Sequence, residues 1–105
     1  MKRYSTVLTI AGSDSGGGAG VQADIKTTSA PGSYAASAIT AVTVQNTIGV
    51  ESVCPIPVET IAGQIRAVLS DIGADAVKIG MLSTKELVLA VTRTLLDRGM
   101  KNIVL

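Results

Sequence analysis

A dense run of glycines between an apolar strand and a helix is the feature that most restricts the fold of this chain. Residues 6–11 are apolar and β-branched, and they end at Gly12. The segment 12–20 contains five glycines, four of them in its last five residues. Residues 21–27 then have the pattern of the first turns of a helix. A strand, a glycine loop and a helix in this order are typical of a parallel α/β sheet.

The glycine loop is also the first candidate binding site. Glycine has no Cβ, so the backbone N–H groups of such a loop can approach a ligand closely. A helix that begins at the loop directs unpaired N–H groups and its positive dipole end toward it. A sharp turn alone also favours glycine. However, so many glycines at the carboxyl end of a strand favour a site for a polar or anionic ligand.

The rest of the chain alternates predicted strands and helices. Strands are expected over 34–45, 50–56, 75–82 and 102–105, and helices over 21–30, 58–72 and 84–98. The apolar face predicted for the middle helix consists of Ile61, Ile65, Val68, Leu69 and Ile72. Residues 83–86 predict a capping box with Ser83 as the N-cap of the last helix. This order predicts one α/β domain over residues 1–105, with a mostly parallel sheet flanked by helices.

Composition excludes several classes of protein. Nine Lys and Arg residues nearly balance eight Asp and Glu residues, so no nucleic-acid partner is expected. The chain has no histidine and only Cys54, which argues against a zinc site and excludes an intramolecular disulfide. No signal-peptide pattern or membrane-spanning apolar run is found, so a cytoplasmic protein with no membrane partner is expected. Hydrophobic residues make up 47% of this small chain, which predicts either that it pairs with another chain, with a homo-oligomer expected, or that it is a piece of a larger fold.

Several known loop motifs do not fit. A Walker phosphate loop requires a lysine after its second glycine, where this chain has only Ala19, Gly20 and Val21. The dinucleotide pattern G-x-G-x-x-G/A matches at Gly18, Gly20 and Ala23, but no acidic residue ends the second strand. A nucleophile elbow requires a histidine, which is absent.

Three residues are expected to converge at the carboxyl ends of the strands. Asp24 lies one turn into the first helix, predicted to face the loop, while Gln45 ends one strand and Met81 follows another. An amide such as that of Gln45 donates and accepts at once, which suits the edge of a nitrogen heterocycle. Asp24 can accept a hydrogen bond from an alcohol, and Met81 can pack against a flat ring. Each residue has a purely structural explanation, but together they favour a small polar substrate.

Three blocks of the sequence resemble the hydroxymethylpyrimidine/phosphomethylpyrimidine kinases of thiamine biosynthesis. The blocks are residues 11–27, residues 39–41 with 45–50, and residues 78–82. The resemblance implies a ribokinase-like α/β fold, of which this chain would be the N-terminal half. It also implies phosphoryl transfer, dependent on ATP and Mg²⁺, to the hydroxymethyl group of an aminopyrimidine and then to its monophosphate.

The resemblance further implies the residues that bind substrate. Gln45 would pair with the aminopyrimidine edge, and Asp24 would lie near the hydroxymethyl group. The pocket would be shaped by Gly12, Ala19, Gly20 and Met81. No catalytic residue or metal ligand is implied here, because the family's catalytic base and anion hole belong to a second half without a counterpart in this chain. The 105-residue chain alone is therefore expected to have negligible kinase activity.

Two alternatives stay open at this point. A pyridoxal-type kinase of the same superfamily would differ mainly in pocket residues such as Gln45. A non-catalytic α/β module would instead bind a small molecule, or a partner through its open sheet edge.

Overall fold

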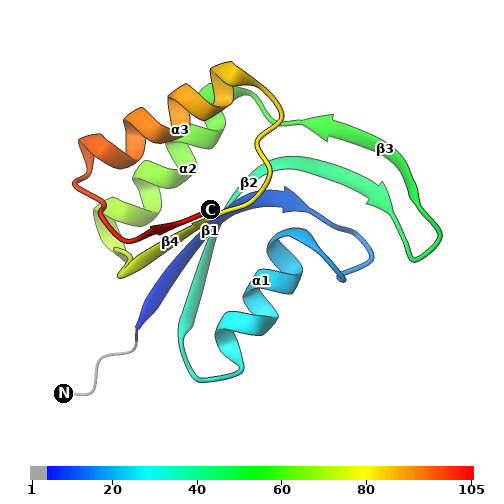
Figure 1. Cartoon of the computed structure of the whole chain (residues 1–105), viewed down its shortest axis with the longest axis horizontal. Coiled ribbons are helices and arrows are strands. Elements are labelled where there is room, and N and C mark those ends of the chain that lie inside the picture. Colours follow the sequence, from blue (N-terminus) through cyan, green and yellow to red (C-terminus); the bar gives the residue numbers. More distant parts are fainter. Residues whose placement is uncertain (1–4) are drawn as a thin grey trace.

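The computed structural model describes residues 5–105, which form a five-stranded sheet with helices on both faces (Figure 1). The strands are β1 (Thr6–Ser13), β2 (Tyr34–Gln45), β3 (Val50–Pro55), β4 (Ala76–Ile79) and β5 (Ile103–Val104). The helices are α1 (Gly20–Ser29), α2 (Val58–Asp71) and α3 (Lys85–Asp97). The strand order is β3-β2-β1-β4-β5, and β3 pairs antiparallel with β2 while the other neighbours are parallel. The prediction of a mostly parallel α/β sheet is confirmed.

Strand β1 lies at the centre of the sheet and presents different chemistry to its two faces. Leu8 and Ile10 are fully buried in the apolar core. Thr9 lies between them, and its hydroxyl donates to the Asp24 carboxylate of α1 at 2.6 Å. Successive side chains of a strand point to opposite faces, so one strand supports both an apolar core and a polar contact with α1. Burying a Leu or Ile side chain stabilises the fold by about 2 kcal/mol.

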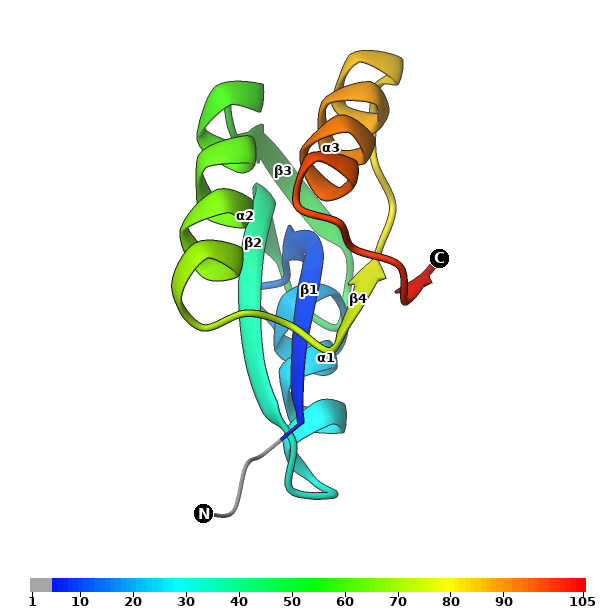
Figure 2. The same cartoon turned by 90° about the vertical axis from the view of Figure 1, so that its left-hand side faces the viewer.

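Helices α2 and α3 lie side by side on one face of the sheet, while α1 lies on the other (Figures 1 and 2). The inward residues of the pair are those expected from helical spacing: Ile61, Ile65, Leu87, Val91 and Leu95 are all buried. Ile72 was expected on the buried face of α2 but is 45% exposed. It follows the last turn of α2, where Gly73 adopts a φ of +74° and ends the helix.

The start of α3 also differs from the prediction. Its N-cap is Thr84, whose hydroxyl accepts the backbone N–H of Leu87 at 3.1 Å. The capping box with Ser83 as N-cap is therefore wrong. Thr84 has an extended backbone and lies three residues before Leu87, which is the usual geometry of an N-cap. Ser83 instead lies in the wall of a pocket.

Two strand boundaries shift in a way that matters for that pocket. β1 continues through Gly12 to Ser13, because Ser13 still pairs with Val42 of β2. β4 is shorter than predicted and ends at Ile79. The next N–H, of Gly80, donates to the Ile10 carbonyl at 2.8 Å, and the chain then leaves the sheet. Met81 consequently lies outside the strand and is 90% exposed.

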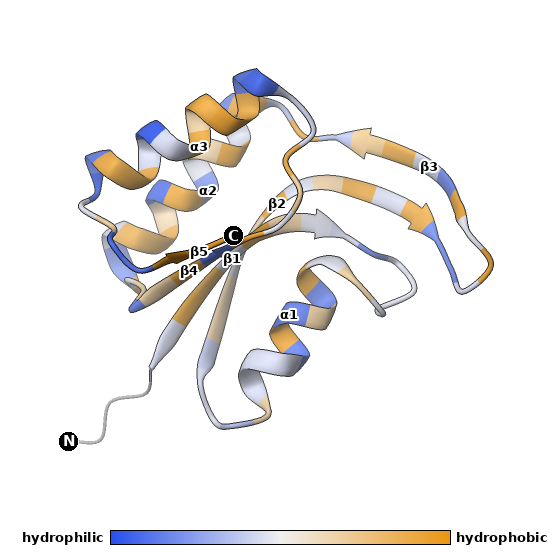
Figure 3. Ribbon diagram, viewed as in Figure 1, coloured by the Kyte–Doolittle hydropathy of each residue, from blue (hydrophilic) through white to orange (hydrophobic). Residues whose placement is uncertain are grey.

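Strand β3 forms one edge of the sheet, and all six of its residues are exposed. With the end of β2 it makes a two-stranded ribbon that extends beyond the helices (Figure 1). Figure 3 shows that apolar residues occur along this ribbon. Over residues 5–105, no helix combines the length and apolar character needed to cross a bilayer.

Candidate functional site

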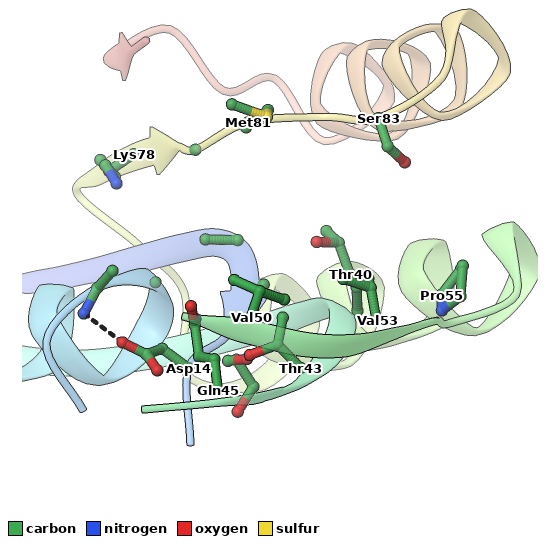
Figure 4. Close-up of a pocket in the computed structure, with 17 residues that line it drawn as sticks. Asp14, Thr40, Thr43, Gln45, Val50, Val53, Pro55, Lys78, Met81 and Ser83 are labelled. Atoms are coloured by element: carbon green, nitrogen blue, oxygen red, sulfur yellow. Dashed lines mark hydrogen bonds between the residues drawn. The ribbon is translucent and has the colours of Figure 1, made fainter. Parts of the chain in front are cut away.

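A pocket of about 550 Å³ opens at the carboxyl ends of β1, β2 and β4 (Figure 4). The end of β1 and both ends of the glycine loop contribute to its wall, together with the β2–β3 ribbon. Met81 and Ser83, from the segment between β4 and α3, lie across from Gln45 and Thr43. In an open α/β sheet this is the usual place for a ligand, because the loops that follow parallel strands meet there.

Most of the predicted site residues meet in this one pocket. Gln45, Met81, Gly12, Ala19 and Gly20 all line it, although they come from three separate segments of the chain. Their roles in binding stay predictions, but their common location is what a shared small-molecule site requires.

Asp24 is placed differently from the expectation. It faces the sheet rather than the glycine loop, because Thr9 of β1 and Lys78 of β4 lie beneath helix α1. Its carboxylate accepts from Lys78 Nζ at 2.9 and 3.1 Å and from the Thr9 hydroxyl at 2.6 Å. Lys78 lines the pocket and Asp24 does not. Among residues 5–105, Lys78 is the hydrogen-bond partner that links Asp24 to the pocket wall.

The glycine loop is held by Asp14, a residue that the sequence pattern did not single out. Its carboxylate accepts the backbone N–H groups of Gly16 at 2.7 Å, Gly18 at 3.0 Å and Ala19 at 2.8 Å. Its main-chain carbonyl accepts the N–H of Gly17 at 3.0 Å. These four N–H groups are engaged within the chain, which corrects the expectation that the loop would offer them to an anionic ligand. An aspartate two residues before a glycine was the available signal, since Asp commonly bonds the backbone two residues ahead.

Two glycines allow the pocket wall to pack closely. Gly20 has a φ of +62°, and a Cβ there would lie 2.2 Å from the Gly12 carbonyl oxygen. A Cβ on Gly80 would lie 2.9 Å from the Cβ of Ala11. Any larger side chain would push the loop or the end of β4 away from β1. At both positions the backbone itself therefore forms the pocket wall, because a side chain has no room there.

Gln45 contributes its backbone to the fold and its side chain to the pocket. Its N–H donates to the Ser15 hydroxyl at 2.8 Å, and the same hydroxyl donates to the Gln45 carbonyl. Among residues 5–105, no hydrogen-bond partner is found for its side-chain amide. Figure 4 shows this side chain in the pocket opposite Met81. The amide is thus a donor and acceptor pair that the described fold leaves available.

A mostly parallel α/β sheet with a pocket at its strand ends and an available amide in the wall is typical of α/β proteins that bind small molecules. The model of the family described as phosphomethylpyrimidine kinase matches residues 14–105. A hydroxymethylpyrimidine/phosphomethylpyrimidine kinase of Haemophilus influenzae is 50% identical over 105 residues, which are 100% of this chain and 39% of that protein. One of Streptomyces coelicolor is 56% identical over 89 residues, 85% of this chain and 33% of that protein.

Solved structures of related kinases also match this chain in fold. A phosphomethylpyrimidine kinase of Clostridium difficile matches with a TM-score of 0.90 and 50% identity over 94% of this chain and 43% of that one. A Bacillus subtilis pyridoxal kinase matches with a TM-score of 0.86 and 38% identity over 96% of this chain and 39% of that one. The chain belongs to the phosphomethylpyrimidine kinase family, as its sequence blocks indicated. It spans less than half the length of these relatives.

Proposed function

We propose that this chain supplies the substrate-binding portion of an ATP-dependent kinase of thiamine biosynthesis. The substrates are 4-amino-5-hydroxymethyl-2-methylpyrimidine and its monophosphate. Membership of the kinase family supports the reaction class. The observation that carries the choice of substrate is the Gln45 amide, which lies in the pocket wall without a partner among the described residues. Its oxygen can accept from an exocyclic amino group while its nitrogen donates to a ring nitrogen.

The other side of the pocket suits the flat body of the same substrate. Met81 is 90% exposed, so its thioether can pack on a ring without disturbing the core. Lys78 lies in the wall at the end of β4, where its charge is balanced by Asp24. In this proposal Asp24 acts at the hydroxymethyl end of the substrate by holding Lys78 in place.

A pyridoxal-type kinase is the second candidate, because a pyridoxal kinase structure matches this chain nearly as well in fold. The higher identity to the pyrimidine kinases favours the first proposal. The two substrates differ in the ring edge that Gln45 would meet, so relative affinity separates them.

ATP is the phosphoryl donor implied by the family. Within residues 5–105, no group of three or more His, Cys, Asp or Glu side chains is arranged to hold a metal ion. The carboxylates of Asp14 and Asp24 are already engaged. The described residues therefore offer no carboxylate cluster that would hold Mg²⁺ without further ligands. A cytoplasmic location, without nucleic-acid or membrane partners, completes the proposal.

Replacing Gln45 with alanine is expected to weaken binding of the aminopyrimidine alcohol about tenfold, because about 1–2 kcal/mol of hydrogen bonding to the ring edge is lost. Titration calorimetry measures the change. The control ligand is the same pyrimidine without its amino group, which should lose less affinity. Unchanged affinity for the aminopyrimidine would reject the proposed role of Gln45. Tighter binding of pyridoxal than of the pyrimidine would favour the second candidate.

The proposal includes self-association of this chain, and the β2–β3 ribbon is the surface that supports it. Exposed apolar side chains lie along both faces of this ribbon: Val42, Val44 and Ile48, together with Val50 and Val53, which also line the pocket. An apolar, exposed edge strand favours pairing with another chain. Sedimentation velocity is expected to show association that rises with concentration, and Val44→Lys should reduce it. Ile72→Lys is the matched control, since Ile72 is 45% and Val44 49% exposed. A monomer at every concentration would contradict the proposal.

A further inference from the structure

Gln45 is the last residue of β2, at the margin of the regular sheet. The parallel ladder between β1 and β2 stops at the pair Ser13 and Val42, three residues before Gln45. On the other side, the pairing of β2 with β3 is irregular between Val44 and Gln45. Sheet pairing alone therefore holds Gln45 less firmly than it holds the residues before it.

Ser15 compensates for the missing ladder on the β1 side. Its hydroxyl accepts the Gln45 N–H at 2.8 Å and donates to the Gln45 carbonyl, so one side chain satisfies both backbone groups of that residue. A hydroxyl can do both because it carries one donor and two acceptor lone pairs.

The loop around Ser15 is itself fixed against the end of β2. Asp14 holds the following residues through its carboxylate. Gly16 lies so close that a Cβ there would be 3.3 Å from the Cα of Asn46. The Thr43 hydroxyl adds a further connection by donating to the Ser13 carbonyl at 2.7 Å. These contacts fix the loop, and with it the position of the Ser15 hydroxyl, relative to the end of β2.

We infer that Ser15 is a positioning residue for substrate recognition, which fixes the backbone of Gln45 so that the side-chain amide meets the substrate's ring edge. The inference rests on the proposed function, because it needs Gln45 to read the aminopyrimidine. Ser15 itself is exposed and is absent from the pocket wall, so its effect on binding passes through Gln45. Pre-organising a recognition group in its bound conformation improves affinity, since less conformational freedom is lost on binding.

A double-mutant cycle tests this coupling by calorimetry with 4-amino-5-hydroxymethyl-2-methylpyrimidine. Ser15→Ala is expected to weaken binding about fivefold in the otherwise unchanged chain, and not at all in a chain that already carries Gln45→Ala. Ser15→Thr keeps a hydroxyl and should restore most of the affinity. Ser70→Ala is the control, because Ser70 is an exposed serine of α2 that bonds only within its helix. An equal loss in both backgrounds would show a general effect on the pocket and overturn the inference.

A second measurement examines the Ser15–Gln45 contact without any ligand. Amide hydrogen exchange followed by NMR should become faster at Gln45 in Ser15→Ala, while exchange in the core of β1 stays unchanged. Unchanged exchange at Gln45 would overturn the inference. If Gln45→Ala leaves ligand affinity unchanged, the proposed function fails. If Gln45→Ala weakens binding and Ser15→Ala does not, only the inference fails.

Discussion

Replacing Gly20 with alanine is expected to lower the free energy of unfolding by about 3 kcal/mol and to abolish measurable binding of the pyrimidine. Two costs add at this position. The φ of +62° is unfavourable for any L side chain, at about 1–2 kcal/mol. The new Cβ would also lie 2.2 Å from the carbonyl oxygen of Gly12, a backbone atom that cannot rotate away. Forced displacement of packed groups commonly costs about 1–3 kcal/mol. Urea unfolding measures the change.

Two other glycines separate these costs. Gly73 has a φ of +74°, but a Cβ there would meet no atom within 4 Å, so Gly73→Ala should show the backbone cost alone. Gly49 has neither constraint, and Gly49→Ala should be nearly neutral. If Gly20→Ala lowers the free energy of unfolding no more than Gly73→Ala does, then the close approach of Gly20 to the Gly12 carbonyl adds no steric cost to a side chain at position 20.

The second large effect is expected at Asp14. Asp14→Asn keeps the shape of the side chain but replaces one carboxylate oxygen with an NH₂ group, which then faces either the N–H of Gly16 or the N–H groups of Gly18 and Ala19. Donors then face donors in a site where Asp14 is only 7% exposed. Hydrogen bonds to a charged acceptor are worth about 1.5–3 kcal/mol each, so the loss of unfolding free energy should be about 3 kcal/mol. Thermal and urea unfolding measure it.

The loop that Asp14 holds also forms part of the pocket, so pyrimidine binding should weaken in Asp14→Asn. Asp97→Asn is the matched control, because Asp97 is exposed at the end of α3. That substitution should change stability by less than about 0.5 kcal/mol. Equal stability of the two variants would show that the carboxylate of Asp14 does not hold the loop together.

The fold followed closely from local patterns. Ile61 and Ile65 are buried as their spacing required, and the β-branched run of β1 became the central strand. The errors lie at element ends, where local signals compete. Ser83 and Thr84 are both good N-caps, and only the path of the chain from β4 decided for Thr84. Ile72 fits the apolar spacing of its helix but is exposed, because Gly73 ends that helix with a positive φ.

The sequence predicted which residues would meet at the candidate site better than it predicted their orientations and hydrogen-bond partners. Gln45 and Met81 were placed at strand ends by pattern, and the structure puts both in one pocket. The direction of Asp24 was not predictable, since its partner Lys78 lies 54 residues away in sequence. Ser15 was expected only as a hydrogen-bonding residue of the loop, and its pairing with the backbone of Gln45 depends on where β2 ends relative to the loop.

The sequence by itself determined the order of strands and helices and which side chains arrive at their carboxyl ends. Periodicity, helix caps and glycine act over only a few residues, and those residues are adjacent in the chain. Only the tertiary structure decided which polar groups remain available. Asp14 takes up the amides of the loop, Asp24 pairs with Lys78, and the side chain of Gln45 has no partner among the described residues. Such partners compete for one another only after the sheet has brought distant segments within hydrogen-bonding distance.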